Sequence, residues 1–143
     1  MPETSYVRTS LEIGFGEEPL PKRFEALRGR EYRSVPLTEE LPFEDRQFEV
    51  VLMHRSALGD DSVKEAHRVL RPGGRLCFQV PEKNKAQGGY TLAEIYALVR
   101  YGFDIVELDR PKWWEFRRLG RTISITARKK NWKQLNNTFR PLV

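Results

Sequence analysis

A glycine-containing turn near the start of the chain is the first pattern that could do chemistry. Residues 6–13 read as a strand, and the chain continues as Leu11-Glu12-Ile13-Gly14-Phe15-Gly16. Glycine has no Cβ and tolerates positive φ, so a Gly-x-Gly turn after a strand lets the backbone pass close to a ligand. The acids that follow, Glu17 and Glu18, would oppose a dinucleotide pyrophosphate. A ligand other than a nicotinamide dinucleotide is favoured, and a purely structural turn is the alternative.

Two longer motifs lie downstream. The first is Leu41-Pro42-Phe43-Glu44-Asp45-Arg46-Gln47-Phe48-Glu49-Val50-Val51-Leu52, and the second is Arg71-Pro72-Gly73-Gly74-Arg75-Leu76. Together with the glycine turn, they resemble the middle of the class I S-adenosylmethionine-dependent methyltransferases of the small type 11 kind. The resemblance covers about residues 7–130, which is most of the chain.

The resemblance implies a fold, a cofactor and a set of contacts. The fold is a three-layer α/β/α Rossmann-like sandwich, whose sheet is mostly parallel and ends in an antiparallel strand. The cofactor is S-adenosyl-L-methionine, and the acid at the position of Glu12 helps to fix the loop and the methionine amino group. The expected cofactor-binding residues are Glu12, Gly14, Phe15, Gly16, Glu39 and Met53.

The segment between the glycine turn and Leu41 is shorter than the family usually has, so one strand–helix unit is expected to be missing. Residues 31–37 are the only β-like run in this segment. If they form the family's third strand, the acid that binds the ribose is absent, and Leu37 stands where an adenine-contacting Asp is common. If they form the second strand, Glu39 or Glu40 could bind the ribose, or both could simply be solvated in a turn.

Hydrophobic periodicity predicts the elements that position these residues. Alternating strands and helices favour a parallel sheet with helices on both faces. Capping-box patterns at Ser62-x-x-Glu65 and Thr91-x-x-Glu94 predict two helix starts. Strands are predicted at residues 6–13, 31–37, 48–53, 76–80, 103–108 and 122–127, and helices at residues 19–27, from 61 or 62 to 70, and from 91 to a stop at Gly102.

His54 is the one candidate for a catalytic base. It follows the strand at residues 48–53, beside which the active site of this fold lies, and methyl transfer needs little more than alignment and sometimes a base. A hydrogen-bonded structural histidine is the alternative. His67 is expected on a helix face, and Cys77 is expected to be a buried structural thiol. The sequence predicts no metal site.

The end of the chain is basic and aromatic. The chain has a net charge of +5, and residues 110–143 hold 10 Lys/Arg, one acid and all three tryptophans. Basic side chains neutralise phosphates and aromatic rings stack on bases, so RNA or an acidic protein partner is one interpretation. The other is an exposed connection whose aromatic rings pack on the sheet. The candidate contacts are Lys112, Trp113, Trp114, Arg117, Arg118, Lys129, Lys130 and Trp132.

The sequence favours a methyltransferase-like domain at residues 1–130 and a polar tail at residues 131–143. It shows neither a signal peptide nor an apolar run long enough to cross a membrane, so an intracellular, cytoplasmic protein is expected. Two functions remain open. One is an S-adenosylmethionine-dependent methyltransferase with an unidentified methyl acceptor. The other is a degenerate member of the family that acts as a binding or assembly subunit, with RNA as one candidate partner.

Overall fold

The computed structural model describes residues 8–38, 40–82, 89–100, 102–110 and 122–130. These residues form six strands and four helical segments, in the order β1-α1-β2-β3-η2-α2-β4-α3-β5-β6. The strands are β1 (Thr9–Ile13), β2 (Glu31–Val35), β3 (Phe48–Met53), β4 (Leu70–Pro81), β5 (Phe103–Asp109) and β6 (Thr122–Lys129). The helical segments are α1 (Lys22–Glu25), the 3-10 turn η2 (Arg55–Ala57), α2 (Asp60–Val69) and α3 (Leu92–Val99).

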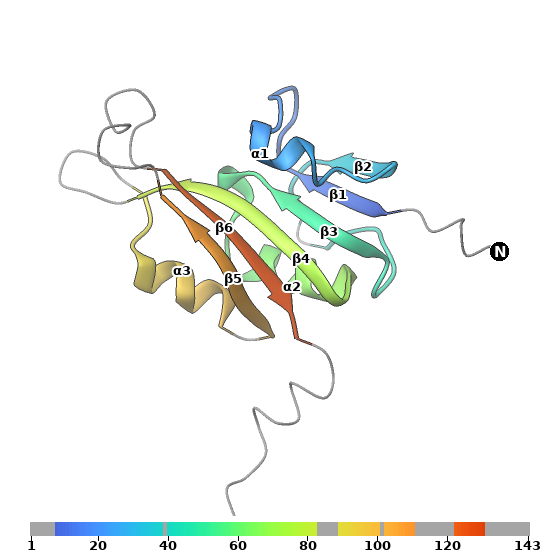
Figure 1. Cartoon of the computed structure of the whole chain (residues 1–143). Coiled ribbons are helices and arrows are strands. Elements are labelled where there is room, and N and C mark those ends of the chain that lie inside the picture. The colour runs from blue at the N-terminus through green and yellow to red at the C-terminus, as the bar shows by residue number, and fades with distance from the viewer. Residues whose placement is uncertain (1–7, 39, 83–88, 101, 111–121, 131–143) are drawn as a thin grey trace, which may run out of the picture.

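The strands form one sheet in the order β2-β1-β3-β4-β6-β5 (Figure 1). The pairs β1–β2, β1–β3 and β3–β4 are parallel, whereas β6 runs antiparallel to both β4 and β5. This arrangement confirms the predicted fold class, including the antiparallel strand at the end. The strand at residues 48–53 matches β3 residue for residue. All of its side chains except Glu49 are buried, as expected for a central strand covered on both faces.

Helices cover the two faces of the sheet unequally. Figure 1 shows α2 and α3 on one side and α1 on the other. Side chains alternate along β1, so Leu11 and Ile13 join the core beneath α2 and α3, whereas Glu12 reaches toward the α1 segment. The α2/α3 face holds the larger core, centred on residues such as Phe78. The α1 face holds a small cluster of six buried residues in the described part of the chain, Phe15, Leu20, Phe24, Val50, Leu52 and Cys77.

The first helix is much shorter than predicted. A helix at residues 19–27 was expected, but α1 is a single turn with only Phe24 buried. The chain must then return to the sheet, where Gly29 lies so close to β1 that an added Cβ would stand 2.2 Å from the Arg8 carbonyl oxygen. The Gly29 N–H donates to Ser10 Oγ at 2.9 Å. Because Gly29 must lie against β1 and β2 already begins at Glu31, the helical segment ends early.

One of the two predicted capping boxes is present. Thr91 Oγ1 accepts the Glu94 N–H, and the Glu94 carboxylate accepts the Thr91 N–H, both at 3.1 Å. The box predicted at Ser62 is wrong, because Gly59 is the N-cap residue of α2 and the Ser62 hydroxyl donates to the Gly59 carbonyl at 3.0 Å. Glu65 instead accepts the Leu41 N–H at 2.8 Å and so fixes the segment that leads into β3.

The strand β2 takes the place of the family's second strand rather than its third. It pairs directly with β1, with Ile13 opposite Val35. In the part of the chain that the structure describes, no strand pairs with its outer side. Four of its five side chains are exposed, which is unlike the interior of a larger sheet. The predicted loss of one strand–helix unit therefore falls at this edge.

Candidate functional site

The glycine loop (residues 14–16) lies where β1 ends, between the ends of β2 and β3. Gly14 donates its N–H to the Val35 carbonyl, and His54 donates its N–H to the Ile13 carbonyl, each at 2.9 Å. Both glycines have positive φ, +82° for Gly14 and +58° for Gly16. We call the end of the sheet where β1, β2 and β3 finish the carboxyl edge. In open parallel sheets, ligands bind in the crevice at this edge.

The two glycines have different surroundings. A Cβ on Gly14 would lie 3.0 Å from the Ala57 Cβ, so this glycine is required by packing against the turn η2. A Cβ on Gly16 would meet nothing within 4 Å. Gly16 is therefore open to approach from outside, and it is the position in the loop where a ligand could come close to the backbone.

Glu12 is occupied by a neighbour that the sequence did not indicate. Its carboxylate accepts two hydrogen bonds from the Arg28 guanidinium, at 2.5 and 2.8 Å, and its side chain is only 4% exposed. The hydrogen bond to Glu12 raises the pKa of Arg28. The pair ties the segment after α1 to the central strand β1. In this structure Glu12 is engaged by protein rather than free to receive an amino group directly.

His54 stands at the end of β3, beside the glycine loop. Its Nδ1 accepts the Ser56 N–H at 3.1 Å, and its Nε2 lies 2.9 Å from a Glu18 carboxylate oxygen. The Phe15 ring meets the imidazole edge to face, with centroids 5.3 Å apart. Since Nδ1 accepts, Nε2 is the nitrogen that donates its proton to Glu18. Both ring nitrogens are bonded, and Glu18, with a side chain 64% exposed, is the partner that can move away.

A pocket of about 100 Å³ joins these residues at the carboxyl edge. Its lining includes three of the predicted site residues, Phe15, Met53 and His54, together with Glu18, Pro19, Pro21, Phe24, Arg55 and Gln79. The structure therefore brings the glycine loop and the end of β3 together as the sequence predicts. The pocket is smaller than the roughly 300–1,000 Å³ of typical small-molecule sites. A whole cofactor would have to extend beyond it along the open side of Gly16.

The ribose position is not filled by an acid among the described residues that directly follow β2. Pro36, Leu37 and Thr38 come first, and Leu37 is 50% exposed. Glu40 is exposed. Glu39 lies outside the described residues. The described residues thus leave the glycine loop open at Gly16, and they supply no acid immediately after β2.

Most of the predicted basic and aromatic contacts also lie outside the described residues, namely Lys112, Trp113, Trp114, Arg117, Arg118 and Trp132. Lys129 is described, and its surroundings argue against the predicted surface role. Its ammonium group donates to the carbonyls of His67 and Leu70, at 2.6 and 2.8 Å, and burial lowers its pKa. Lys129 therefore holds the end of α2 onto β6. Lys130 lies 3.7 Å from Asp104, within ion-pair distance.

Sequence reasoning missed three residues that contact the predicted site: Arg28, Glu18 and Ser56. Glu18 carried a signal, since an acid directly after a glycine turn lies near its ligand. Ser56 follows His54 by two positions, and a histidine at the start of a 3-10 turn can accept such a backbone N–H. Arg28 carried no signal, because its pairing with Glu12 depends on how the short α1 segment returns to the sheet.

Comparison with known proteins shows which family this chain resembles. A family model described as a methyltransferase domain matches residues 25–78. The chain is similar to the class I S-adenosylmethionine-dependent methyltransferases, in sequence over this segment and in fold over most of its length. S-adenosylmethionine is the cofactor of this family. The match includes β2, β3, α2 and the first part of β4, which contain the two longer motifs seen in the sequence.

Curated relatives match over a limited stretch. The mitochondrial 2-methoxy-6-polyprenyl-1,4-benzoquinol methylase of Bos taurus is 37% identical over 76 residues, which cover 48% of this chain and 20% of that protein. The chain thus spans about a fifth of the length of the curated relatives that it matches. No helix among the described residues is long and apolar enough to cross a membrane.

Solved structures share the fold over most of the chain. One is the complex between the Haloferax volcanii Trm112 methyltransferase activator and a methyltransferase, with a TM-score of 0.64, 16% identity and coverage of 87% of this chain and 83% of that chain. Another is the Burkholderia thailandensis 1,6-didemethyltoxoflavin-N1-methyltransferase with bound S-adenosylhomocysteine. Its TM-score is 0.59 and its identity 20%, and the match covers 90% of this chain and 74% of that chain.

Proposed function

We propose that this chain binds S-adenosylmethionine at the carboxyl edge of its sheet and takes part in methyl transfer. The observation that carries the proposal is the glycine loop: two glycines with positive φ at the end of β1, the second open to a ligand, beside a pocket that contains His54. The family resemblance and the Burkholderia structure with bound S-adenosylhomocysteine support this choice of ligand.

When bound, S-adenosylmethionine supplies an electrophilic methyl group on a sulfonium sulfur. The chain's own residues would bind this cofactor and orient it. The loop at Gly16 approaches the methionine end, and Met53 and Phe15 form an apolar wall beside it. Glu18 orients the imidazole of His54 by accepting a hydrogen bond from its Nε2. His54 could take a proton from a methyl acceptor at Nε2 only in the tautomer that carries its proton on Nδ1, where Nδ1 donates to the Ser56 hydroxyl 2.7 Å away, and only after the exposed Glu18 moves away from Nε2.

The proposed class of methyl acceptor rests on the names of the curated relatives. The curated relatives methylate, by their name, a benzoquinol, which makes quinols the first acceptors to test. A second candidate function is a binding subunit that keeps the fold without catalysis. The Glu12–Arg28 pair favours it, because the acid that the family resemblance assigns to the methionine amino group is already satisfied by protein. An acidic protein or RNA at the basic end of the chain is the partner that this second function would involve.

Calorimetry with S-adenosylhomocysteine tests the proposed site. Gly16→Asn is the blocking variant, because asparagine tolerates positive φ and its side chain would fill the open space at the loop. Gly73→Asn is the matched control, since Gly73 also has positive φ with nothing near its Cβ position but belongs to β4 outside the pocket. We expect Gly73→Asn to bind like the wild type and Gly16→Asn to lose binding.

Two results would contradict the proposal. Equal binding by wild type and Gly16→Asn would place the ligand elsewhere. No binding by the wild type at millimolar ligand would favour the non-catalytic subunit. We expect modest affinity, because no described residue directly after β2 supplies the charged hydrogen bond to the ribose, which is worth roughly 1.5–3 kcal/mol.

A further inference from the structure

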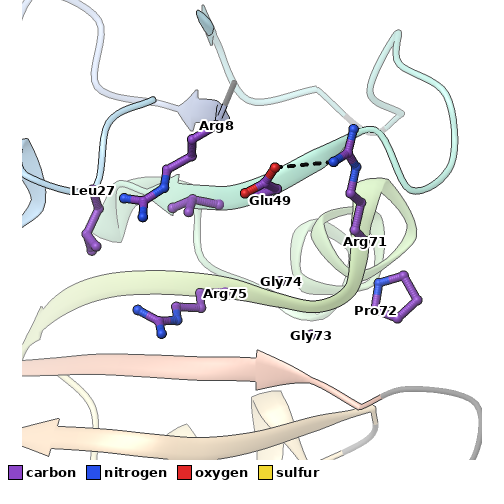
Figure 2. A pocket seen from close by; sticks show the side chains of 9 residues that line it. Arg8, Leu27, Glu49, Arg71, Pro72, Gly73, Gly74 and Arg75 are labelled. Carbon is purple, nitrogen blue, oxygen red and sulfur yellow. Dashed lines mark hydrogen bonds and ion pairs between the residues drawn. The ribbon is translucent and has the colours of Figure 1, made fainter. Parts of the chain in front are cut away.

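A second pocket lies at the opposite end of the sheet. It has a volume of about 310 Å³ and is formed where β3 and β4 begin, beneath the segment that follows α1. Figure 2 shows Arg8, Arg71 and Arg75 around it, with Glu49 reaching Arg71. Strand residues rise about 3.3 Å each, so the six positions from Arg8 to Gly14 place this pocket roughly 20 Å from the glycine loop. It is therefore distinct from the carboxyl edge.

The charge of the pocket is strongly positive. Three guanidinium groups come from two parts of the chain, the start of β1 and the turn into β4. Among the described residues that line the pocket, Glu49 is the only acid, and it is engaged, with an oxygen 3.2 Å from the Arg71 guanidinium. Within the described residues, neither Arg8 nor Arg75 has a side-chain hydrogen bond or an ion pair. The lining thus carries three positive charges and one negative charge.

We propose that this pocket binds a small organic phosphate. A phosphomonoester carries about −1.5 to −2 charges near neutral pH, which matches the net positive charge of the lining. Guanidinium groups bind phosphate oxygens with paired hydrogen bonds. Arg8 and Arg75 can supply such bonds, because neither is paired with a carboxylate among the described residues. The remaining wall is apolar: Leu27, Val50 and Pro72 face the space and suit the organic part of such a ligand. The volume lies at the lower end of the usual range for small-molecule sites.

The shape favours a small molecule over a nucleic acid. The arginines line a recess whose floor includes the buried Val50, rather than a flat or extended stripe along the surface. Single-stranded nucleic acids need a groove that follows the backbone, with aromatic rings for the bases, and no aromatic side chain is among the described residues that line this pocket. The inference is independent of cofactor binding at the carboxyl edge.

Calorimetric titration of the full chain with phenyl phosphate tests the pocket. Benzenesulfonate serves as a singly charged ligand of similar shape, and inorganic phosphate serves as a ligand without the apolar part. We expect phenyl phosphate to bind more tightly than either. Arg8→Gln and Arg75→Gln should each weaken its binding at least about tenfold, because each removes a charged hydrogen-bond donor. Arg33→Gln, an exposed site on β2 outside the pocket, should leave binding unchanged.

Glu49→Gln distinguishes an effect on the binding site from a loss of folding. Removing its negative charge and releasing Arg71 should tighten phenyl phosphate binding, whereas a merely destabilised protein would bind less. Three outcomes would overturn the proposal: no binding of phenyl phosphate at millimolar concentration, an equal loss of affinity in Arg33→Gln, or weaker binding by a folded Glu49→Gln. Single-stranded RNA that binds more tightly than phenyl phosphate and loses affinity in Arg8→Gln and Arg75→Gln would likewise show that these arginines serve a different ligand.

Discussion

The two faces of the sheet differ in how completely they are covered, and the difference shows where this chain can hold ligands. Beneath α2 and α3, the described residues include 20 buried members of one core, whereas the α1 face has six. Both pockets draw on the smaller cluster: Val50 lines one, and Phe15 and Phe24 line the other. The densely packed α2/α3 face therefore contributes most of the stability, and the sparsely covered α1 face leaves room for ligands.

The sharpest test of this comparison uses one phenylalanine from each face. Phe78 is fully buried beneath α2 and α3, and Phe24 is 2% exposed on the single turn of α1. Phe78→Ala should lower the free energy of unfolding by about 3–5 kcal/mol. Phe24→Ala should cost less, about 2 kcal/mol, because a one-turn segment can move to close the cavity. Urea unfolding followed by circular dichroism measures both, and an equal or larger loss for Phe24→Ala would break the comparison.

The second test compares two ion pairs, one on each face. Arg28→Gln would leave the buried Glu12 carboxylate without its guanidinium, at a cost of about 2–3 kcal/mol. Arg68→Gln should cost about 1–2 kcal/mol, because Glu65 is more exposed and still accepts the Leu41 N–H. Adding Glu12→Gln to Arg28→Gln should recover part of the loss by removing the unpaired charge. Denaturant unfolding of the three variants and the wild type decides this, and a smaller loss for Arg28→Gln than for Arg68→Gln would be inconsistent with the account.

The smallest effect concerns pH and the α2/α3 face. Burial, with the nearby charge of Lys129, lowers the pKa of His67 to about 4 from 6.5, and its ring packs on Phe103. The folded protein thus holds His67 neutral, whereas the unfolded chain takes up a proton below pH 6.5. Stability should fall as the pH drops from 6.5 toward 4 and should not depend on His67 above 6.5. His67→Leu should flatten this part of the thermal-melting profile, and an unchanged slope would assign the pH dependence to other groups.

The sequence predicted those parts of the molecule that depend on local patterns. β3 was predicted residue for residue, because a central strand is apolar on both faces, and the Thr91 capping box needs only residues three positions apart. Burial raises the pKa of the Cys77 thiol to about 11, which agrees with the predicted structural thiol. The meeting of Phe15, Met53 and His54 in one pocket follows from the parallel sheet, which gathers strand ends at one edge.

The features that the sequence did not predict depend on contacts between distant residues. Lys129 looks like a surface base in the sequence, yet the carbonyls that bind it lie about 60 positions earlier, at the end of α2. Arg28 looks like one of many exposed arginines, and only the early end of α1 brings it onto Glu12. The pocket around Arg8 and Arg75 could not be foreseen, because it requires the register of β3 against β4.

One measurement tests the central claim, that the carboxyl edge holds the cofactor. Backbone amide shifts of the full chain, followed by NMR during titration with S-adenosylhomocysteine, report which end of the sheet responds. The account predicts that the largest changes fall at Gly14, Phe15, Gly16 and His54, with little change at Gly73 and Arg75. It would be contradicted if the largest changes fell at Gly73 and Arg75, or if saturating ligand changed none of these amides.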